Sequence, residues 1–560
     1  MGILNLFGTR RPRGRTLSEV ERHVKKITRK IVRSRGVISP TKSRIAKRKQ
    51  KVSHDSKIHE HMDDLNKNSS EKQHEKDKFS ARERIDLLLD EGTFIEVGTL
   101  VGANLSEEQF MPAAVITGFG NVNGQKVCVY AQDFPNRGGS LGEAEGQKIC
   151  NILDIALKER VPVIALLDSG GARIQEGVGA LGFYGKIFRK TAEASGVIPQ
   201  FSLILGPCAG GAVYCPALTD FIIMTRENSN MFVTGPDVVK SVTGEDVSAD
   251  DLGGGLMHSE TSGVCHYLAD DEAQALEYTR VLLSYLPPNS EQPNQRYDYI
   301  PDANDEANAK FLNDLVPENP KQGYDVLDVI YALVDYEEFI EVHALFAPSC
   351  VVGLARINGE TVGIVANQPA FNAGTLDIDA SEKIARFVNF CDAFNIPLIT
   401  LVDVPGYRPG LQQERAGIIR RGAKVITAYA TATVPLITVV LRKAYGGAYI
   451  VMGSKEIGAD INLAWPGAQI AVLGAEGAVQ IIHRKALAKA KLRGEEHILR
   501  QKLIDEYTKT TINANMSQEK GAIDALISPD ETRNHIVNAL ELLRGKKNNT
   551  TAKKHDNRPL

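Results

Sequence analysis

The stretch Leu441–Met452 reads L-R-K-A-Y-G-G-A-Y-I-V-M and follows an apolar run, Val434–Leu441, which predicts a buried strand. A glycine pair at the end of a strand lets a ligand approach the backbone closely, because no Cβ intervenes. If the chain then turns into a helix, the N–H groups of Gly447 and Ala448 are free to donate outward, as an enolate or other oxyanion requires. For one such pair alone, a tight strand-to-helix connection without a ligand is the better explanation.

A second glycine pair occurs earlier in the chain, again after an apolar run. The segment Gly206–Ala212 reads G-P-C-A-G-G-A, and its Gly210 and Gly211 lie 236 residues before Gly446 and Gly447. Further positions repeat at nearly this spacing: Pro199 with Pro435 at 236, and Pro162 with Pro397 and Asp168 with Asp403 at 235. Chance similarity between buried strands explains one match but not the whole set. The spacing therefore predicts an internal duplication, with one candidate oxyanion hole in each copy.

Five longer motifs carry a resemblance to a known family. They are D-S-G-G-A-R-I-Q-E-G at Asp168–Gly177, F-V-T-G-P-D-V-V at Phe232–Val239, V-D-V-P-G-Y at Val402–Tyr407, R-K-A-Y-G-G-A-Y at Arg442–Tyr449 and A-W-P-G-A-Q-I-A-V at Ala464–Val472. From about Lys57 onward the chain resembles the biotin-dependent carboxyltransferases that act on acyl-CoA, the β subunits of acetyl-CoA and propionyl-CoA carboxylases. The C-terminal Arg558-Pro559-Leu560 resembles the actinobacterial members. The resemblance implies an α/β fold of two tandem crotonase (ClpP-like) β-β-α superhelix domains related by internal duplication.

Composition and the resemblance together divide the chain into four parts. We expect a basic, disordered extension over residues 1–53, a first carboxyltransferase domain for acyl-CoA over 54–300, a second for carboxybiotin over 301–545, and a flexible tail over 546–560. The linker is predicted from the proline-rich segment Leu286–Tyr324, which contains six prolines.

The basic extension is the strongest charge asymmetry in the chain. Residues 1–53 carry 17 Lys and Arg against two Glu, so the remainder has a net charge of −18 although the whole chain has −3. Such an arm can bind a polyanion or fold onto the acidic body. It contains few aromatic residues to stack bases, so we expect no nucleic-acid partner. A disordered, functionally neutral extension is the favoured interpretation, and a misassigned start codon is the alternative.

The rest of the composition excludes several classes of protein. Apolar residues make up 43% and charged residues 24% of the chain, as in ordinary globular proteins. No run approaches the roughly 18 apolar residues of a membrane span, and no secretory signal is evident. The seven cysteines are odd in number and form no C-x-x-C pair, which predicts reduced thiols, no zinc site and a cytoplasmic location.

The resemblance assigns roles to the candidate site residues. It implies that the backbone of Gly210 and Gly211 stabilises the thioester enolate, and that the backbone of Gly447 and Ala448 stabilises the ureido oxygen of biotin. Each hole would lower the barrier by ~3–4 kcal/mol. The remaining expected contacts are Gly406, Tyr407, Gly417, Ile418 and Gly446 for carboxybiotin, and Ser169, Gly170, Gly171, Ala172, Arg173 and Ile450 for acyl-CoA.

Two of these side chains leave alternatives open. Arg173 either donates to the CoA phosphates or pairs with Glu176 in its own loop. Ile450 directly follows the second glycine pair and is expected to line the acyl pocket. In the family, Asp here accompanies a preference for propionyl-CoA and an apolar residue accompanies tolerance of acetyl-CoA, so we expect both substrates to be used.

The reaction needs a partner that this chain does not contain. None of its eight methionines is followed by Lys, so no Met-Lys biotinylation motif is present, and no G-x-x-x-x-G-K-[ST] loop occurs. No convincing nucleophile–base pair is found, which fits chemistry in which the cofactor supplies the base. The resemblance implies carboxybiotin on a biotin carboxylase/biotin carboxyl carrier α subunit, acyl-CoA as substrate, no metal, and a homo-hexamer built as a trimer of dimers.

Two other functions compete with this one. The carboxyltransferase subunit of a sodium-pumping decarboxylase, or of a transcarboxylase, shares the fold and both holes, because the partner subunits set the direction of the reaction. A non-catalytic scaffold that binds polyanions through residues 1–53 is the alternative from another class.

Local patterns give four further expectations. Helices should fill Lys57–Gly92, with Ser80 as the N-cap of the second. Asn121–Gly124 should be a hairpin turn. The glycine- and acid-rich Phe232–Gly255 is expected to be a solvated loop, and Gln480–Ile504 a charged helical arm.

Overall fold

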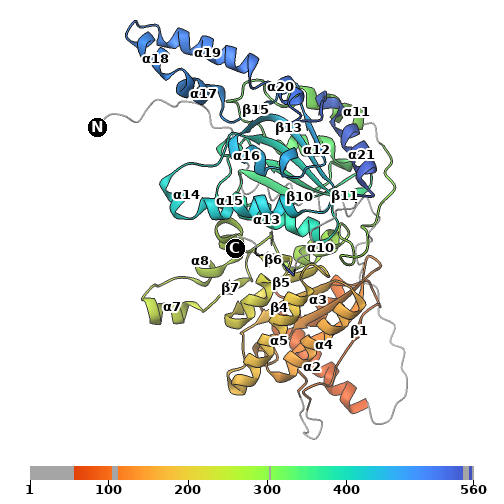
Figure 1. Cartoon of the computed structure of the whole chain (residues 1–560). Helices are drawn as coiled ribbons and strands as arrows, with labels where there is room; N and C mark the ends of the chain where they lie inside the picture. The colour runs from red at the N-terminus through yellow and green to blue at the C-terminus, as the bar shows by residue number, and fades with distance from the viewer. Residues whose placement is uncertain (1–55, 104–110, 302–303, 547–553, 556, 558–560) are drawn as a thin grey trace. The chain divides into compact units, whose positions relative to one another are not determined.

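Two units make up the chain (Figure 1). The computed structural model describes residues 56–103, 111–301, 304–546, 554–555 and 557. The first unit ends at Asn294 and the second begins at Gln295. This division lies within the proline-rich segment Leu286–Tyr324. The predicted domain boundaries at residues 300 and 545 remain predictions. The expected disordered extension, 1–53, and most of the expected tail, 546–560, lie outside the described residues.

The first unit is built on one mixed sheet. Its strand order is β1-β2-β3-β4-β5-β6-β8, with β7 paired to β5. β1, β2 and β3 pair antiparallel, and the pairs from β3 onward are parallel. The strands are β1 (Ile95–Glu96), β2 (Val115–Val122), β3 (Gln125–Gln132), β4 (Val163–Ser169), β5 (Gln200–Ala209), β6 (Phe221–Thr225), β7 (Asn230–Phe232) and β8 (Tyr267–Ala269).

Helices cover this sheet. α4 lies against β2 and β3 and packs on α5, whereas α10 lies against β5, β6 and β8 and packs on α3. The helices are α2 (Ser56–His74), α3 (Ala81–Leu88), α4 (Glu143–Glu159), α5 (Val178–Ala194), α6 (Tyr214–Ala217), α7 (Pro236–Thr243), α8 (Ala249–Gly253), α9 (Gly255–Met257) and α10 (Glu272–Leu283).

The second unit repeats the sheet. Its order is β9-β10-β11-β12-β13-β14-β16, with β15 paired to β13. The strands are β9 (Phe339–Val342), β10 (Cys350–Ile357), β11 (Glu360–Asn367), β12 (Leu398–Val404), β13 (Leu436–Tyr445), β14 (Ile461–Ala464), β15 (Gln469–Ala471) and β16 (Ala525–Leu526). The helices are α11 (Asn304–Leu315), α12 (Val326–Leu333), α13 (Ile378–Ala393), α14 (Leu411–Arg415), α15 (Ile418–Thr431), α16 (Gly446–Val451), α17 (Ala475–Ile482), α18 (Arg484–Lys491), α19 (Glu496–Thr510), α20 (Ala514–Glu519) and α21 (Thr532–Leu543).

The two sheets have the same topology, strand for strand. Each begins with three antiparallel strands, continues in parallel, and adds a short strand beside the end of its longest one. The predicted α/β fold and internal duplication are therefore confirmed. The repeat also explains the spacing of 235–236 residues, because each matched pair occupies the same place in its own sheet.

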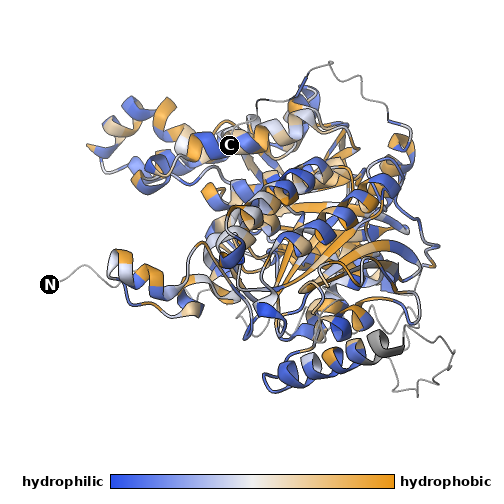
Figure 2. Cartoon of the chain, turned by 90° about the horizontal axis from the view of Figure 1, so that it is seen from below, coloured by the Kyte–Doolittle hydropathy of each residue, from blue (hydrophilic) through white to orange (hydrophobic). Residues whose placement is uncertain are grey.

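The central strands explain why the sequence forms these sheets. β4 and β12 are buried along their whole length, as expected for parallel strands with both faces covered. On one face, Val163 and Leu167 of β4 and Ile399 and Leu401 of β12 join a hydrophobic core of their own unit. Figure 2 shows the strands as mostly hydrophobic and the helices with one hydrophilic side, the pattern that lets a helix cover a sheet and still face water.

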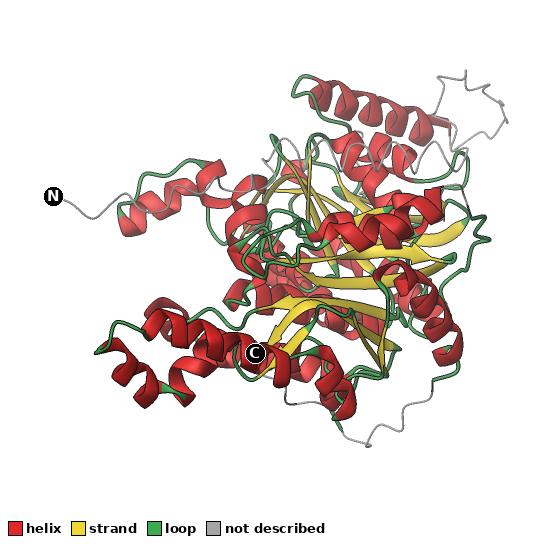
Figure 3. Cartoon of the chain, turned by 90° about the horizontal axis from the view of Figure 1, so that it is seen from above, coloured by secondary structure: helices red, strands yellow, loops and turns green. Residues whose placement is uncertain are grey.

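The structure also tests the four local expectations. A capping box at Ser80 and Glu83 starts α3, and the Asn121–Gly124 turn joins β2 to β3, so both are confirmed. The arm is confirmed as α17–α19 (Figure 3). The solvated loop predicted over Phe232–Gly255 is wrong in part, because α7 and α8 form there. Pro236 at the first turn and a Ser248 side-chain cap supply the helix starts.

Candidate active site

The two glycine pairs lie at equivalent strand ends. β5 ends at Ala209 and runs into a 3-10 turn, Gly210–Val213, whereas β13 ends at Tyr445 and runs into α16. Gly210 and Gly446 both have left-handed backbone angles, with φ of 64° and 61°. Glycine adopts this conformation without the steric cost that a Cβ brings. Both connections are thus the strand-to-helix turns on which the oxyanion-hole interpretation depends.

Gly447 is one of the glycines whose backbone angle and surroundings do not require glycine. Its φ is not in the left-handed region, and a methyl group added there would meet no atom within 4 Å. At Gly211 an added methyl group would lie 3.4 Å from the ring of Tyr184, which is ordinary contact. Backbone strain and crowding therefore do not require glycine at either position, and the space beside Gly447 is open to a ligand.

The first turn of α16 supplies N–H donors beside that space. The N–H groups of the first helical turn have no preceding carbonyl within the helix to accept them. In α16 these are the N–H groups of Gly446, Gly447 and Ala448. Gly447 is exposed and Ala448 is fully buried, so the donors lie at the boundary between the core and solvent. An oxygen that carries negative charge fits this arrangement.

A second loop beside each hole follows the neighbouring strand. In the first unit Ser169 is buried, and its hydroxyl accepts the N–H of Gly171 at 3.1 Å. A bridge joins Leu141 to Ala172, and in the second unit the equivalent bridge joins Leu376 to Tyr407. Gly170 is exposed at the turn. The expected acyl-CoA loop and Gly406–Tyr407 therefore hold matching places in the two units.

Arg173 is held by carboxylates. Its Nη2 lies 2.8 Å from Glu145 and its Nη1 2.6 Å from Glu176, and it also donates to the carbonyl of Ser140 at 2.9 Å. Burial disfavours the charged guanidinium, but the hydrogen bonds and charges of the two glutamates outweigh it and raise the pKa of Arg173. The pairing with Glu176 that the sequence left open is therefore present. Only 9% of Arg173 is exposed.

The other expected biotin contacts cluster near the start of α15. Gly417 precedes the helix with φ of 83°, and Ile418 is its first, buried residue. Tyr407 packs on the same helix, because a methyl group added at Gly422 would meet its hydroxyl at 3.0 Å. Ile450 lies on α16 and is 47% exposed, close to the 49% of Tyr214, which occupies the equivalent position in the first unit.

Sequence reasoning missed the buried charges beneath both holes. Asp168 and Asp403 are fully buried, and each is neutralised by one Lys and one Arg. Arg442 and Lys443 belong to the motif R-K-A-Y-G-G-A-Y, but the sequence alone indicates no role for them. The available clue was a pair of cations directly after an apolar strand, since a buried cation requires a carboxylate.

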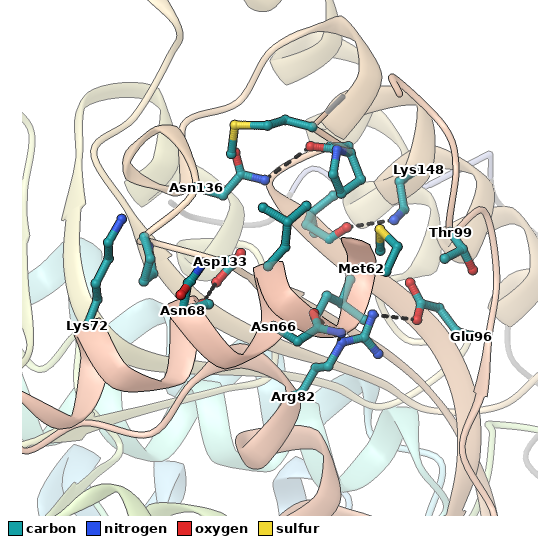
Figure 4. Close-up of a pocket in the computed structure, with 18 residues that line it drawn as sticks. Met62, Asn66, Asn68, Lys72, Arg82, Glu96, Thr99, Asp133, Asn136 and Lys148 are labelled. Carbon is teal, nitrogen blue, oxygen red and sulfur yellow. Dashed lines mark hydrogen bonds and ion pairs between the residues drawn. The ribbon is translucent and has the colours of Figure 1, made fainter. Parts of the chain in front are cut away.

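A separate cavity of about 130 Å³ lies in the first unit between α2, α4 and the start of β2 (Figure 4). No residue there had been singled out from the sequence. In Figure 4 the ammonium of Lys148 reaches the carbonyl of Val115 at 2.7 Å, and Arg82 pairs with Glu96 at 2.8 Å. Burial lowers the pKa of Lys148 to about 8.

Two searches of the described residues are negative. None of their helices is long and apolar enough to cross a bilayer. Within the same ranges, no group of three or more His, Cys, Asp or Glu side chains is arranged to hold a metal ion.

Comparisons with known proteins identify the family. The model of the carboxyl transferase domain matches residues 72–558. The chain is 55% identical over 506 residues to the propionyl-CoA carboxylase beta chain of Saccharopolyspora erythraea, covering 87% of this chain and 92% of that protein. It is 48% identical over 497 residues to the methylmalonyl-CoA decarboxylase subunit alpha of Propionigenium modestum, covering 88% and 95%.

A solved structure agrees with the sequence comparisons. Transcarboxylase 12S, a hexamer with methylmalonyl-coenzyme A and methylmalonic acid bound, superposes with a TM-score of 0.85 at 45% identity, covering 91% of this chain and 100% of that one. The fold of this chain therefore has a known counterpart. This chain belongs to the carboxyl transferase domain family and is a carboxyltransferase of the biotin-dependent carboxylases.

Proposed function

We propose that the chain is the carboxyltransferase β subunit of an acyl-CoA carboxylase, a C–C bond-forming ligase. It moves the carboxyl group of carboxybiotin on a carrier protein to the α-carbon of propionyl-CoA or acetyl-CoA, giving methylmalonyl-CoA or malonyl-CoA. The observation that carries the proposal is the repetition of one glycine turn at the ends of β5 and β13, with open space beside Gly447. A reaction that passes through two anions has a use for two such turns.

The residues of this chain act mainly through their backbone. Carboxybiotin supplies the carboxyl group and the base when it is bound. The N–H groups at Gly210–Gly211 would stabilise the negative charge that develops on the thioester oxygen, and those at Gly447–Ala448 the charge on the ureido oxygen. A donor placed in advance needs no reorganisation during the reaction, and each hole would contribute ~3–4 kcal/mol.

The open space at Gly447 would let the ureido ring of biotin approach the backbone closely. A side chain there would fill the position that the ligand needs. Around it we assign Gly406, Tyr407, Gly417, Ile418 and Gly446 to carboxybiotin. For acyl-CoA we assign Ser169, Gly170, Gly171 and Ala172 through the loop backbone. Arg173 shapes that loop through Glu145 and Glu176 rather than reaching for phosphate.

The proposal includes the partners and the setting. The carboxybiotin comes from a separate biotin carboxylase/carrier α subunit, and six copies of this chain form the core, as transcarboxylase 12S does. All seven cysteines are buried free thiols, the state expected in a reducing cytoplasm. Malonyl-CoA made there would supply fatty acid biosynthesis.

Ile450 gives the proposal its substrate range. Its apolar side chain extends from the helix that carries the second hole and is partly exposed. A relative named biotin-dependent acetyl-/propionyl-coenzyme A carboxylase beta5 subunit, from Mycobacterium tuberculosis, is 51% identical over 512 residues and covers 90% of this chain. We therefore expect both acetyl-CoA and propionyl-CoA to be carboxylated.

The second candidate is the carboxyltransferase subunit of a decarboxylase or transcarboxylase. Its support is the 48% identity to the Propionigenium modestum subunit and the likeness to transcarboxylase 12S. The same two holes serve either direction of transfer, so the choice depends on the partner.

The deciding experiment is carboxyl transfer by the purified full chain. Carboxybiotin on a biotinylated carrier domain is offered with acetyl-, propionyl- or butyryl-CoA, and the carboxylated products are measured. Turnover of propionyl-CoA and acetyl-CoA is expected. Folded protein that binds CoA but transfers nothing to any acyl-CoA would contradict the proposal.

A further inference from the structure

Each candidate hole is preceded by an irregular stretch of its strand. From Leu167 to Ser169, β4 advances two residues, while β5 advances four, from Ile204 to Cys208. From Val402 to Val404, β12 advances two residues, while β13 advances four, from Val440 to Ala444. Both long strands therefore carry the same bulge, 235–236 residues apart. The bulge ends directly before the glycine turn, so its shape sets the direction in which the chain enters the hole.

A fully buried aspartate lies against each bulge, on the neighbouring strand. In the first unit this is Asp168, whose Oδ1 would lie 1.9 Å from a methyl group added at Gly206. The bulge and the carboxylate are thus in direct contact, with no space between them. In the second unit Asp403 accepts the backbone N–H of Lys443, within the bulge, at 3.2 Å.

Cations from the helical segment before the sheet hold Asp168. Lys78 donates to its Oδ2 at 2.6 Å and Arg84 at 3.0 Å. Arg84 also donates to Glu272 at 2.7 Å and to the carbonyl of Leu205, in the bulge, at 3.1 Å. A single guanidinium therefore connects the aspartate to the strand that leads to Gly210.

Cations from the bulge itself hold Asp403. Arg442 donates to its Oδ2 at 3.0 Å, and the ammonium of Lys443 lies 3.3 Å from its Oδ1. Arg442 also binds the proline-rich segment before the sheet: it donates to the carbonyls of Pro317, Asn319 and Gln322 at 3.1, 2.9 and 3.0 Å.

We infer that Asp168 and Asp403 are positioning residues for the two holes: each fixes the bulge before its glycine turn and so the aim of the N–H donors. This inference rests on the proposed function of the holes. It goes beyond that function by assigning the aim of each backbone donor to a buried side chain that does not itself touch substrate. A purely structural pair would stabilise the fold without changing the hole.

The test compares Asp168→Asn and Asp403→Asn with matched controls in the full chain. Asp90 and Asp335 are the controls. Each is an ion-paired aspartate that accepts a backbone N–H from its β-hairpin turn, and each lies more than 100 residues along the sequence from the glycine turn of its unit. Carboxyl transfer at saturating substrate and the Kd for propionyl-CoA are measured for all four variants. We expect kcat to fall about 10- to 100-fold in Asp403→Asn and Asp168→Asn, with Kd within twofold of the parent, and no such fall in the controls.

A second readout does not depend on activity. Backbone hydrogen exchange within the bulges, at residues 204–208 and 440–444, should become at least tenfold faster in the unit that carries the changed aspartate, and not in the controls. Unchanged exchange in the bulges, or equal kcat losses in the controls, would overturn the inference. A parent protein without transfer activity would instead count against the proposed function, while the exchange experiment still decides the role of the aspartates.

Milder variants cover the case in which the asparagine proteins do not fold. Lys78→Met and Lys443→Met each remove one of the two cations and leave the arginine in place. The same faster exchange is expected in the corresponding bulge, by a smaller factor, and unchanged exchange there would likewise overturn the inference.

Discussion

In the first unit, the cations that neutralise the buried aspartate come from residues far away along the chain, Lys78 and Arg84. In the second unit they come from the adjacent strand, Arg442 and Lys443. The cluster occupies the same place in both sheets, beneath the same bulge. Both copies therefore keep a neutralised carboxylate against the bulge, but the cations that neutralise it come from different parts of the chain. A search for repeated side chains finds the aspartates and misses their partners.

A second matched pair shows the same divergence. Lys148 and Lys383 lie 235 residues apart on α4 and α13. Lys383 donates to three backbone carbonyls, whereas Lys148 donates to the carbonyl of Val115 and borders the cavity of Figure 4. The second unit satisfies its buried ammonium more completely than the described part of the first does.

The largest expected effect is on stability, from Arg84→Met. This change leaves Asp168 and Glu272 buried without their shared guanidinium, and losing one partner of a buried pair costs about 3–5 kcal/mol. Arg442→Met should cost less, because a single carboxylate, Asp403, loses a partner and Lys443 stays, and the three carbonyls that also lose their donor are only partly buried. Urea unfolding followed by hydrogen exchange reports each unit separately. Equal losses would mean that the two clusters are energetically alike.

The next effect separates the two glycine turns. Gly447→Ala places a methyl group in open space, so the protein should fold normally while carboxyl transfer falls about 10²–10³-fold. Gly211→Ala directs its methyl group at the ring of Tyr184, so a smaller loss, about tenfold, is expected. Gly545→Ala, at another open position beyond the last helix, is the control and should transfer normally. Unchanged carboxyl transfer in Gly447→Ala would contradict the proposal that a ligand occupies the open space beside Gly447.

The third effect concerns pH. Burial lowers the pKa of Lys148 from its ordinary 10.5 to about 8. Between pH 8 and 10.5 the unfolded chain therefore holds a proton on this side chain that the native chain lacks. This group therefore makes the native state gain stability as the pH rises through that window. In Lys148→Met the gain is absent, and the variant should lose up to about 3 kcal/mol relative to the parent between pH 7 and 10.5.

Denaturant unfolding at several pH values measures that difference. Lys383→Met is the matched variant, and it should already be destabilised at pH 7, because three carbonyls in the core lose their donor. If the free energies of unfolding of Lys148→Met and the parent differ by the same amount at every pH, the lowered pKa of Lys148 is contradicted.

The smallest effect concerns substrate choice. Ile450→Asp should lower kcat/KM for acetyl-CoA relative to propionyl-CoA by about 10- to 200-fold, the range that one methylene group allows. Tyr214→Ala changes the equivalent, similarly exposed position of the first unit and should leave the ratio unchanged. If Tyr214→Ala shifts the ratio and Ile450→Asp does not, acyl choice belongs to the first hole.

The sequence predicted the fold well because its strands are apolar and repeat at a constant spacing. It placed the end of β13 too early, at Leu441, because charged residues do not normally continue a buried strand. The strand runs on to Tyr445 since Asp403 neutralises Arg442 and Lys443. Such compensation depends on tertiary contacts and was invisible from local pattern.

The candidate site shows the same limit. Both glycine turns could be predicted, because glycine pairs after apolar runs are local features. The cluster at Asp168 could not be, since Lys78 and Arg84 lie 90 and 84 residues away and belong to a segment rich in ordinary surface charge. The role of Arg173 depended on Glu145, which lies on another element.

The source of each cation also sets an order of events during synthesis of the chain. Arg84 leaves the ribosome well before Asp168, so that aspartate meets a finished partner. Asp403 emerges 39 residues before Arg442, a delay of about 2–8 seconds at ordinary elongation rates. Until then β12 carries a carboxylate that it cannot bury. Translation pauses between these two codons would therefore lengthen the time for which an apolar strand of the second unit stays open to chaperones and to aggregation.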